Sequence, residues 1–162
     1  YKIEEVEIGL PEAGWNLIGD PLKDKRRPKS VVDGQFSMPF CAAVVLREGN
    51  MNWDDYKKHL NDDDTLAFCR KINVTIDPRA QAEFPANMAG FVKIKSNGNF
   101  FEKFVAIPKG EPENFMSKEE IIIKFEGLCQ PYLGEEGANE LANTILALEE
   151  SNTVSRFLAL SR

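Results

Sequence analysis

The chain has 162 residues with 43% hydrophobic and 28% charged side chains, enough for one domain of ordinary size with its own core. A net charge of −6 argues against nucleic-acid binding, and no apolar run approaches the ~20 residues that a membrane-spanning helix needs. Three scattered cysteines suggest free thiols in an intracellular compartment, the cytoplasm or the mitochondrion, and a single histidine, His59, leaves almost nothing for a zinc site or a Ser-His-Asp triad.

The first ten residues alternate apolar and charged side chains, which is typical of a half-buried strand. The apolar positions, most of which share one parity, are Ile3, Val6, Ile8 and Leu10. The chain begins at Tyr1 rather than Met and enters this strand at once, so we expect it to be a piece of a longer polypeptide.

A long loop is predicted over residues 11–32, which hold prolines, glycines and a basic cluster at residues 23–29. Irregular loops of ~12–15 residues or more are often functional. Its basic side chains, Arg26, Arg27 and Lys29, could attract a polycarboxylate or could simply solvate the loop, and the sequence leaves both roles open.

The most apolar stretch of the chain follows this loop. Residues 40–46 carry no polar side chain, and a helix that is apolar on every side is a buried one. Ser37 is a suitable N-cap, Pro39 fits the first turn, and Gly49 ends the run. We therefore predict a central buried helix over residues 37–48.

Short elements fill the next forty or so residues. Helical spacing predicts a helix over residues 52–60 with His59 on its exposed side, and the polar run 61–64 should cap a further helix rather than bind a metal. Residues 72–77 alternate strictly and are β-branched, so they predict a strand. Residues 79–87 are expected to form a loop.

The clearest local signal is a β-hairpin. Asn97-Gly98 suits a two-residue type I′ turn because both central residues need positive φ. The flanking runs 89–95 and 99–107 predict two strands, each with one face that packs and one that is partly wet.

Helices are predicted for the rest of the chain. Residues 117–120 form a capping box before the apolar run 121–125, which suggests a helix packed on two sides, and Pro131 and Gly134 should break it. Further helices are predicted over residues 135–150 and 154–160.

The order of these elements predicts one α+β domain over residues 1–162. It should contain a small mixed sheet of about four strands packed on the central buried helix, with helices at the C-terminal end. The sequence has no phosphate loop, dinucleotide fingerprint or repeat, so the residues alone name no reaction.

Three features in order resemble the C-terminal part of the MmgE/PrpD family, which includes 2-methylcitrate dehydratase, cis-aconitate decarboxylase and iminodisuccinate epimerase. They are the strand at residues 2–8, the Arg-Pro-Lys and Asp-Gly-Gln-Phe-Ser-Met-Pro-Phe segment within 27–40, and the Gly-Glu-Pro to Lys-Phe segment within 108–125. The resemblance covers nearly the whole chain.

The resemblance implies a lid domain. Family members have a large all-helical domain and a smaller α+β lid, with the active site between them, and helices 117–162 are expected to belong partly to the helical domain. The parent protein would be a homodimeric lyase or isomerase that abstracts a proton next to a carboxylate of a small di- or tricarboxylate. It would need no metal or organic cofactor, and the lid alone would be inactive.

The resemblance also singles out candidate substrate-binding residues, although no catalytic residue is assigned. Several relatives hold a tyrosine at the position of Phe40, which here cannot donate a hydrogen bond and is either part of the cleft or plain core. Gln35 and Ser37 could face a carboxylate from the helix N-terminus, unless Ser37 only caps. Arg27 and Lys29 complete the set.

Two other classes of function stay open. The chain could be a non-catalytic binding module that uses the exposed face of the Asn97-Gly98 hairpin or the basic loop. It could also belong to a pseudoenzyme of the same family, which the phenylalanine at position 40 favours.

Overall fold

The computed structural model describes residues 2–151 and 153–161, and the chain divides into two compact units, Tyr1–Asn114 and Phe115–Arg162. The N-terminal unit holds the sheet and the central helix, and the C-terminal unit is helical. The sequence predicted one α+β domain over residues 1–162, with the helices of residues 117–162 belonging partly to the helical domain of the parent protein. The assignment of those helices to the helical domain stays a prediction. Tyr1, the first residue of the predicted N-terminal strand, lies outside the described residues.

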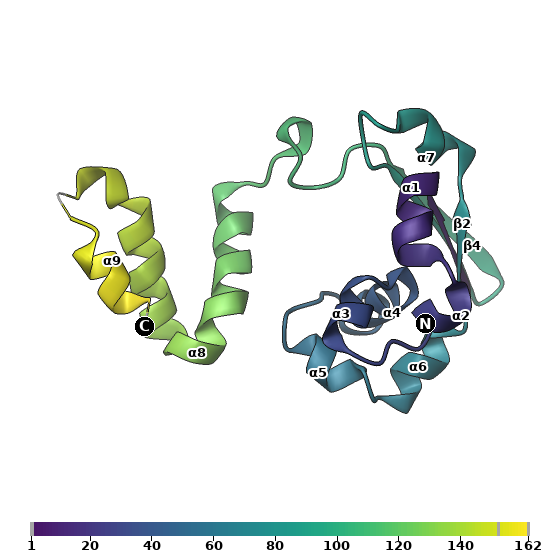
Figure 1. Ribbon diagram of the computed structural model, residues 1–162, viewed down its shortest axis with the longest axis horizontal. Helices are drawn as coiled ribbons and strands as arrows, with labels where there is room; N and C mark the ends of the chain where they lie inside the picture. The colour runs from purple at the N-terminus through teal and green to yellow at the C-terminus, as the bar shows by residue number, and fades with distance from the viewer. Residues whose placement is uncertain (1, 152, 162) are drawn as a thin grey trace. The chain divides into compact units, whose positions relative to one another are not determined.

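A four-stranded mixed sheet forms the N-terminal unit, which confirms the predicted α+β class (Figure 1). Its strands are β1 (Ile3–Leu10), β2 (Ile72–Ile76), β3 (Gly90–Ser96) and β4 (Asn99–Val105). They lie in the order β2-β1-β3-β4, with β1 parallel to β2 and the other two pairings antiparallel.

The alternation in β1 sets the core face of the sheet. Val6, Ile8 and Leu10 are buried, as the sequence predicted. The pairing of β1 with β3 shifts register between Ile3 and Glu5, so Ile3, which has the opposite parity, still packs against the same core.

Short helices occupy the segment predicted as a long loop, so that prediction is wrong. They are α1 (Glu12–Gly14), the π-helical turn η1 (Trp15–Gly19), α2 (Leu22–Lys25) and α3 (Val31–Gln35). Contacts with distant residues hold them in place: Trp15 Nε1 donates to the carbonyl of Val74 at 3.2 Å. Single-turn helices depend on such packing because their own hydrogen bonds are few.

The central helix α4 (Met38–Glu48) begins and ends as predicted. The Ser37 side chain accepts from the Phe40 N–H, and Gly49 closes the helix at φ +85°. The prediction that α4 is buried on every side is wrong, however, because Val45 is 43% exposed. Only one face of α4 packs against the sheet and its neighbours.

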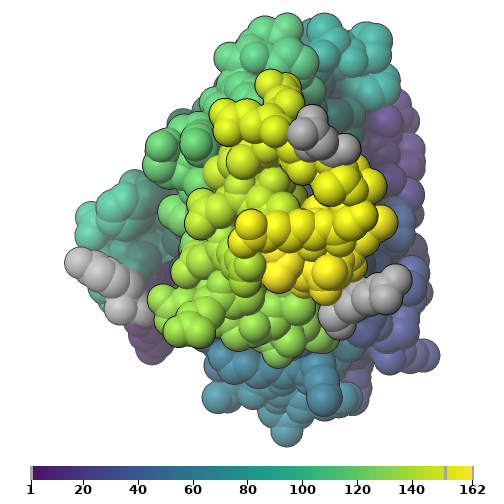
Figure 2. Space-filling model, turned by 90° about the vertical axis from the view of Figure 1, so that its left-hand side faces the viewer, coloured from purple at the N-terminus to yellow at the C-terminus, as the bar shows by residue number. Residues whose placement is uncertain are grey.

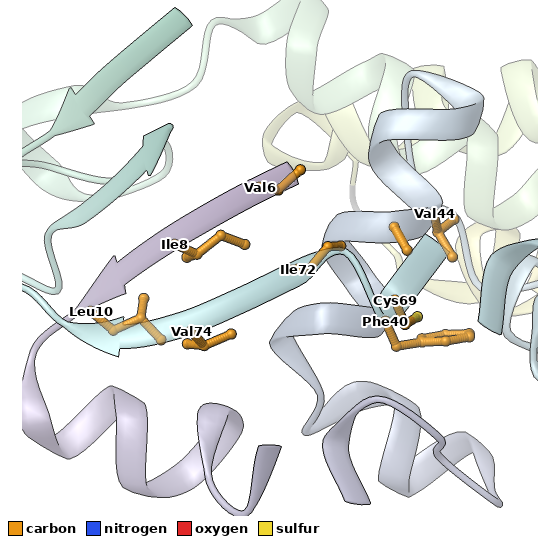
Figure 3. Close-up of a cluster of buried hydrophobic side chains, with 9 residues drawn as sticks. Val6, Ile8, Leu10, Phe40, Val44, Cys69, Ile72 and Val74 are labelled. Atoms are coloured by element: carbon orange, nitrogen blue, oxygen red, sulfur yellow. The ribbon is translucent and has the colours of Figure 1, made fainter. Parts of the chain in front are cut away.

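The core lies between β1, β2 and α4, with α6 (Asp63–Cys69) closing one end (Figure 3). Its buried apolar side chains are Val6, Ile8, Leu10, Phe40, Ala43, Val44, Cys69, Ile72 and Val74. The helix predicted over residues 52–60 is shorter, α5 (Asp55–His59), and starts one turn later.

Residues 79–87 were predicted as a loop, but most of them belong to helix α7 (Pro78–Glu83). The Asp77 carboxylate caps this helix by accepting from the N–H groups of Arg79 at 2.8 Å and Ala80 at 3.2 Å. Pro78 ends strand β2, as predicted, and at the same time occupies the first helical position, where its missing N–H is harmless.

The hairpin turn is confirmed by φ values of 50° at Asn97 and 76° at Gly98. Its second strand packs less than predicted. Phe101 is 59% exposed and Val105 is also exposed, and β4 lies at the edge of the sheet.

The C-terminal unit contains α8 (Lys118–Leu146), the 3₁₀ turn η3 (Leu148–Glu150) and α9 (Ser155–Leu160); a further 3₁₀ turn, η2 (Pro112–Asn114), ends the N-terminal unit. The predicted capping box at Ser117 is present, and Gly134, at φ +70°, interrupts α8 as predicted. Figure 2 shows the surface of this unit in green to yellow, where α9 lies against the second half of α8, and Arg156 pairs with Glu140 at 2.9 Å.

The prediction that residues 121–125 are packed on two sides is wrong for the described part of the chain, since Ile123 is 68% exposed. None of the helices in the described part of the chain combines the length and apolar character needed to span a bilayer.

Candidate functional site

Ser37, at the start of α4, does not reach the molecular surface. Its Oγ accepts from the N–H of Phe40 at 3.1 Å and donates to the carbonyl of Lys25. The first bond caps α4 and the second ties α4 to α2. Of the two roles that the sequence allowed for Ser37, these contacts show the capping one, and substrate binding stays a prediction.

Phe40 lies in the core rather than at the surface. It is fully buried and stacks on the ring of Tyr56, with ring centroids 6.1 Å apart and an angle of 22° between the planes. The Tyr56 hydroxyl interacts with the Cys41 thiol, and burial raises the pKa of both groups. The core role that the sequence left open for Phe40 is therefore the one its position fits.

Arg27 and Lys29 come together at a concave surface of about 460 Å³, which we name the Lys29 hollow. Its lining residues are Pro21, Asp24, Lys25, Arg27, Pro28, Lys29, Val32, Asp33 and Phe36. Gln35 is exposed at the end of α3, next to Phe36, but it does not line the hollow.

The backbone of the Lys29 hollow is held by a carboxylate. Asp33 accepts from the Lys29 N–H at 3.1 Å, while the Ser30 hydroxyl accepts from the Asp33 N–H at 3.1 Å. The bond from the Lys29 backbone and those from Ser30 lower the pKa of Asp33. Asp33 stays ionised and partly offsets the positive charge, so the hollow fits a single carboxylate group better than a large polyanion.

Arg26, grouped with Arg27 and Lys29 in the sequence, is anchored to the sheet. Its Nε and Nη2 donate to the carbonyl of Ile72 at 3.0 Å and 2.6 Å, and Nη2 also donates to Asn73 Oδ1 at 2.6 Å. The same guanidinium lines a second concave surface of about 750 Å³, between α2 and α6, which we name the α2–α6 groove.

The α2–α6 groove contains residues that sequence reasoning did not assign to any site. It is lined by Lys23, Arg26, Arg27, Asp63, Asp64, Leu66, Ala67 and Arg70. Arg70 follows α6 in a stretch without any binding motif, so no local signal could have connected it with residues 23–27.

His59 was predicted to be exposed, and this is wrong because it is 1% exposed. The Thr65 hydroxyl donates to Asp62 Oδ2, so the Thr65 oxygen accepts from Nδ1–H of His59 at 2.8 Å. Nε2 then faces Glu48 Oε1 at 3.4 Å. These contacts join α4, α5 and α6, and the sequence could not reveal them because the partners lie on three separate helices.

The aspartates at residues 62–64 serve the helix that follows, as predicted. Asp62 accepts from the N–H of Thr65 at 2.9 Å and caps α6. Among the residues that the structure describes, no group of three or more His, Cys, Asp or Glu side chains is placed to hold a metal ion.

The chain belongs to the MmgE/PrpD family: it matches the MmgE/PrpD C-terminal domain over residues 1–150. A curated relative, the cis-aconitate decarboxylase-like protein oryM of Aspergillus oryzae, is 27% identical over 163 residues, which cover 99% of this chain. The chain spans 33% of the length of that relative.

Proposed function

We propose that this chain is the C-terminal lid portion of a PrpD-like lyase or isomerase that acts on a small di- or tricarboxylate. The observation that carries the proposal is the match to the family's C-terminal domain over residues 1–150. The relative is described as cis-aconitate decarboxylase-like, which supports a substrate of this class. The reaction would be a dehydration, decarboxylation or epimerisation that begins with removal of a proton next to a carboxylate.

The Lys29 hollow is our candidate for the surface through which the lid contacts a substrate carboxylate. Arg27 and Lys29 are exposed there, and neither is paired with a carboxylate in the described part of the chain. Cationic groups stabilise the negative charge that develops when a proton leaves the carbon next to a carboxylate. Gln35, exposed nearby, would add a neutral donor.

The general base is proposed to come from an upstream helical domain of the same polypeptide. His59 is buried and hydrogen-bonded to Thr65, so it is not placed to take a proton from a substrate. Closure of the lid would exclude water from the site. The parent enzyme would be an intracellular homodimer of the cytoplasm or the mitochondrion that needs no metal or organic cofactor.

The test is to assay the parent polypeptide, with its upstream region, for dehydration, decarboxylation and epimerisation of aconitate-like acids. We expect one of these activities in the parent and none in residues 1–162 alone. Arg27→Gln and Lys29→Gln should each raise KM about tenfold, the loss of one charge-assisted hydrogen bond. Lys57→Gln, an exposed lysine of α5 outside the hollow, is the matched control.

A parent that binds these acids without converting them would instead indicate a pseudoenzyme, which the buried Phe40 in place of a phenol favours. A parent that neither binds nor converts them would favour a binding module. Phe100 and Phe101 of the hairpin, 62% and 59% exposed, are the surface to test in that case.

A further inference from the structure

The α2–α6 groove gathers positive charge that the protein itself does not neutralise. Lys23, Arg26, Arg27 and Arg70 line it, and within the described residues none of them forms an ion pair with a carboxylate. Four unpaired cations around one concavity stand out in a chain whose net charge is −6. Such a concentration attracts anions, because field lines are focused in a hollow with low-dielectric walls.

Among the basic side chains of the groove, Arg26 is a hydrogen-bond donor that the protein holds in a fixed position. Its Nε and Nη2 are held by the Ile72 carbonyl and the Asn73 side chain, which are neutral, so the guanidinium keeps its full charge. Arg26 Nη1 has no hydrogen-bond acceptor within the described residues. It is also not one of the fully buried polar atoms that lack a hydrogen-bond partner there. Nη1 is therefore accessible to solvent, and Arg26 lines the groove. A donor held in place loses little freedom when an anion binds.

The two aspartates of the groove lie away from these donors. Asp63 and Asp64 begin α6 and Arg70 follows its last residue, so about 9 Å of helix separates Asp64 from Arg70 at 1.5 Å per residue. Arg70 is close in sequence to Ile72, whose carbonyl holds Arg26. The charges of Arg26 and Arg70 both act on Cys69, the last residue of α6. An anion should therefore prefer the Arg70 end of the groove and avoid the aspartate end.

We propose that the α2–α6 groove binds an oxyanion with at least two negative charges, either a phosphate group or a pair of carboxylates. Four cations and two carboxylates leave the lining with a formal charge of +2, which a dianion neutralises. Arg26 Nη1 is the fixed donor, and Arg27, Lys23 and Arg70 complete the anion's surroundings. The volume of about 750 Å³ suits a small molecule that carries such a group, with Leu66 and Ala67 as its apolar contacts.

The site lies wholly within the N-terminal unit, so binding to residues 1–162 tests it whatever reaction the parent protein performs. Inorganic phosphate and citrate are titrated separately into the chain at constant ionic strength, with calorimetry as the readout. Arg70→Gln and Lys23→Gln should each weaken binding about fivefold, and Asp64→Asn should tighten it by a similar factor, since a single charge in a partly screened groove is worth roughly this much.

Lys57→Gln, which removes an exposed lysine outside both the groove and the Lys29 hollow, is the control variant and should leave affinity unchanged. Binding of phosphate alone would identify a phosphate group as the ligand, and binding of citrate alone would identify paired carboxylates. The proposal is overturned if neither anion binds at about 10 mM, a concentration that detects dissociation constants in the millimolar range, or if Lys57→Gln weakens binding as much as Arg70→Gln does.

Discussion

Two apolar helices of this chain, α4 and the first half of α8, look alike in sequence and differ in their surroundings. Each follows a serine that caps it, Ser37 for α4 and Ser117 for α8. In α4, Phe40 and Val44 are fully buried, whereas in α8 Ile121 is 44% exposed and Ile123 is 68% exposed. An apolar run thus shows that a helix needs a partner, but it does not show that the partner is in the same chain.

The exposed isoleucines of α8 agree with the proposal that the C-terminal unit packs on a helical domain of the parent. In water, each exposed large apolar side chain forgoes about 1.5–3 kcal/mol of burial free energy. If the proposal holds, that free energy is recovered in the parent. The comparison of the two helices can therefore be tested first by side-chain truncation in each.

The largest expected effect is that of Phe40→Ala. Removing a fully buried ring that stacks on Tyr56 should lower the free energy of unfolding by about 3–5 kcal/mol. Ile123→Ala should change it by less than about 0.5 kcal/mol in residues 1–162. Urea unfolding measures both, with tryptophan fluorescence for the N-terminal unit, which holds Trp15 and Trp53, and far-UV circular dichroism for the helices of the other unit.

Val45→Ala is the matched control within α4, since Val45 is on its exposed side. It should cost well under 1 kcal/mol. Equal losses for Phe40→Ala and Val45→Ala would mean that α4 is not anchored by one face. A large loss for Ile123→Ala would mean that α8 has a partner within this chain.

Replacing the capping serine should destabilise the chain more at Ser37 of α4 than at Ser117 of α8. Ser37 is buried and bonded both to the Phe40 N–H and to the Lys25 carbonyl, so Ser37→Ala should cost about 2 kcal/mol, one for the cap and one for the carbonyl left without its donor. Ser117 is exposed and its side chain caps α8 within a capping box, so Ser117→Ala should cost about 0.5–1 kcal/mol.

The same urea experiments measure both serine variants. Ser37→Thr serves as the control because it keeps the hydroxyl. If Ser37→Ala is no more destabilising than Ser117→Ala, the bond to Lys25 contributes nothing to the attachment of α2.

Local sequence signals were enough to predict the elements whose formation depends on neighbouring residues. The alternation of Val6, Ile8 and Leu10, the Asn97-Gly98 turn and the caps at Ser37 and Ser117 each depend on residues close in sequence. All of them appear in the structure where they were predicted.

The segments that were predicted wrongly depend on distant residues. Residues 11–32 contain prolines and glycines that suggest a loop, yet Trp15 bonds to Val74 and Arg26 to Ile72, and these contacts hold short helices. The pattern of apolar residues within such a short segment cannot predict a hydrogen bond to a strand about fifty residues away. His59 is buried for the same kind of reason, through Thr65 on another helix.

The candidate site was predicted only in part. Arg27 and Lys29 line one concave surface, whereas Ser37 and Phe40 of the same segment are buried, and the role of all four as substrate ligands stays a prediction. Arg27 and Lys29 lie in the irregular stretch between α2 and α3, whereas Ser37 and Phe40 belong to the start of α4, on the side that packs into the core. Arg70 was missed since it reaches the groove only through the packing of α6.

The smallest expected effect concerns the C-terminal ends of the two helices. The last turn of α4 contains Arg47, whose guanidinium pairs with Asp62, the cap of α6, whereas the last turn of α8 has no basic residue. Hydrogen bonds from Thr65 and Arg47 hold the pKa of Asp62 below its usual range. Ionised Asp62 therefore stabilises the folded chain above the unfolded-state pKa of about 4, and this stabilisation is lost as the pH falls through the lower, folded-state pKa.

Asp62→Asn keeps a capping oxygen and removes the charge, so it should lower the urea midpoint at neutral pH, and the difference from the unmodified chain should shrink from about pH 4 downward. A double-mutant cycle with Arg47→Gln isolates the ion pair from the cap. Coupling that is absent at neutral pH, or that persists unchanged in acid, would show that Arg47 joins α4 to α6 by packing of its stem rather than by its charge. The end of α4 would then differ from the end of α8 in shape alone.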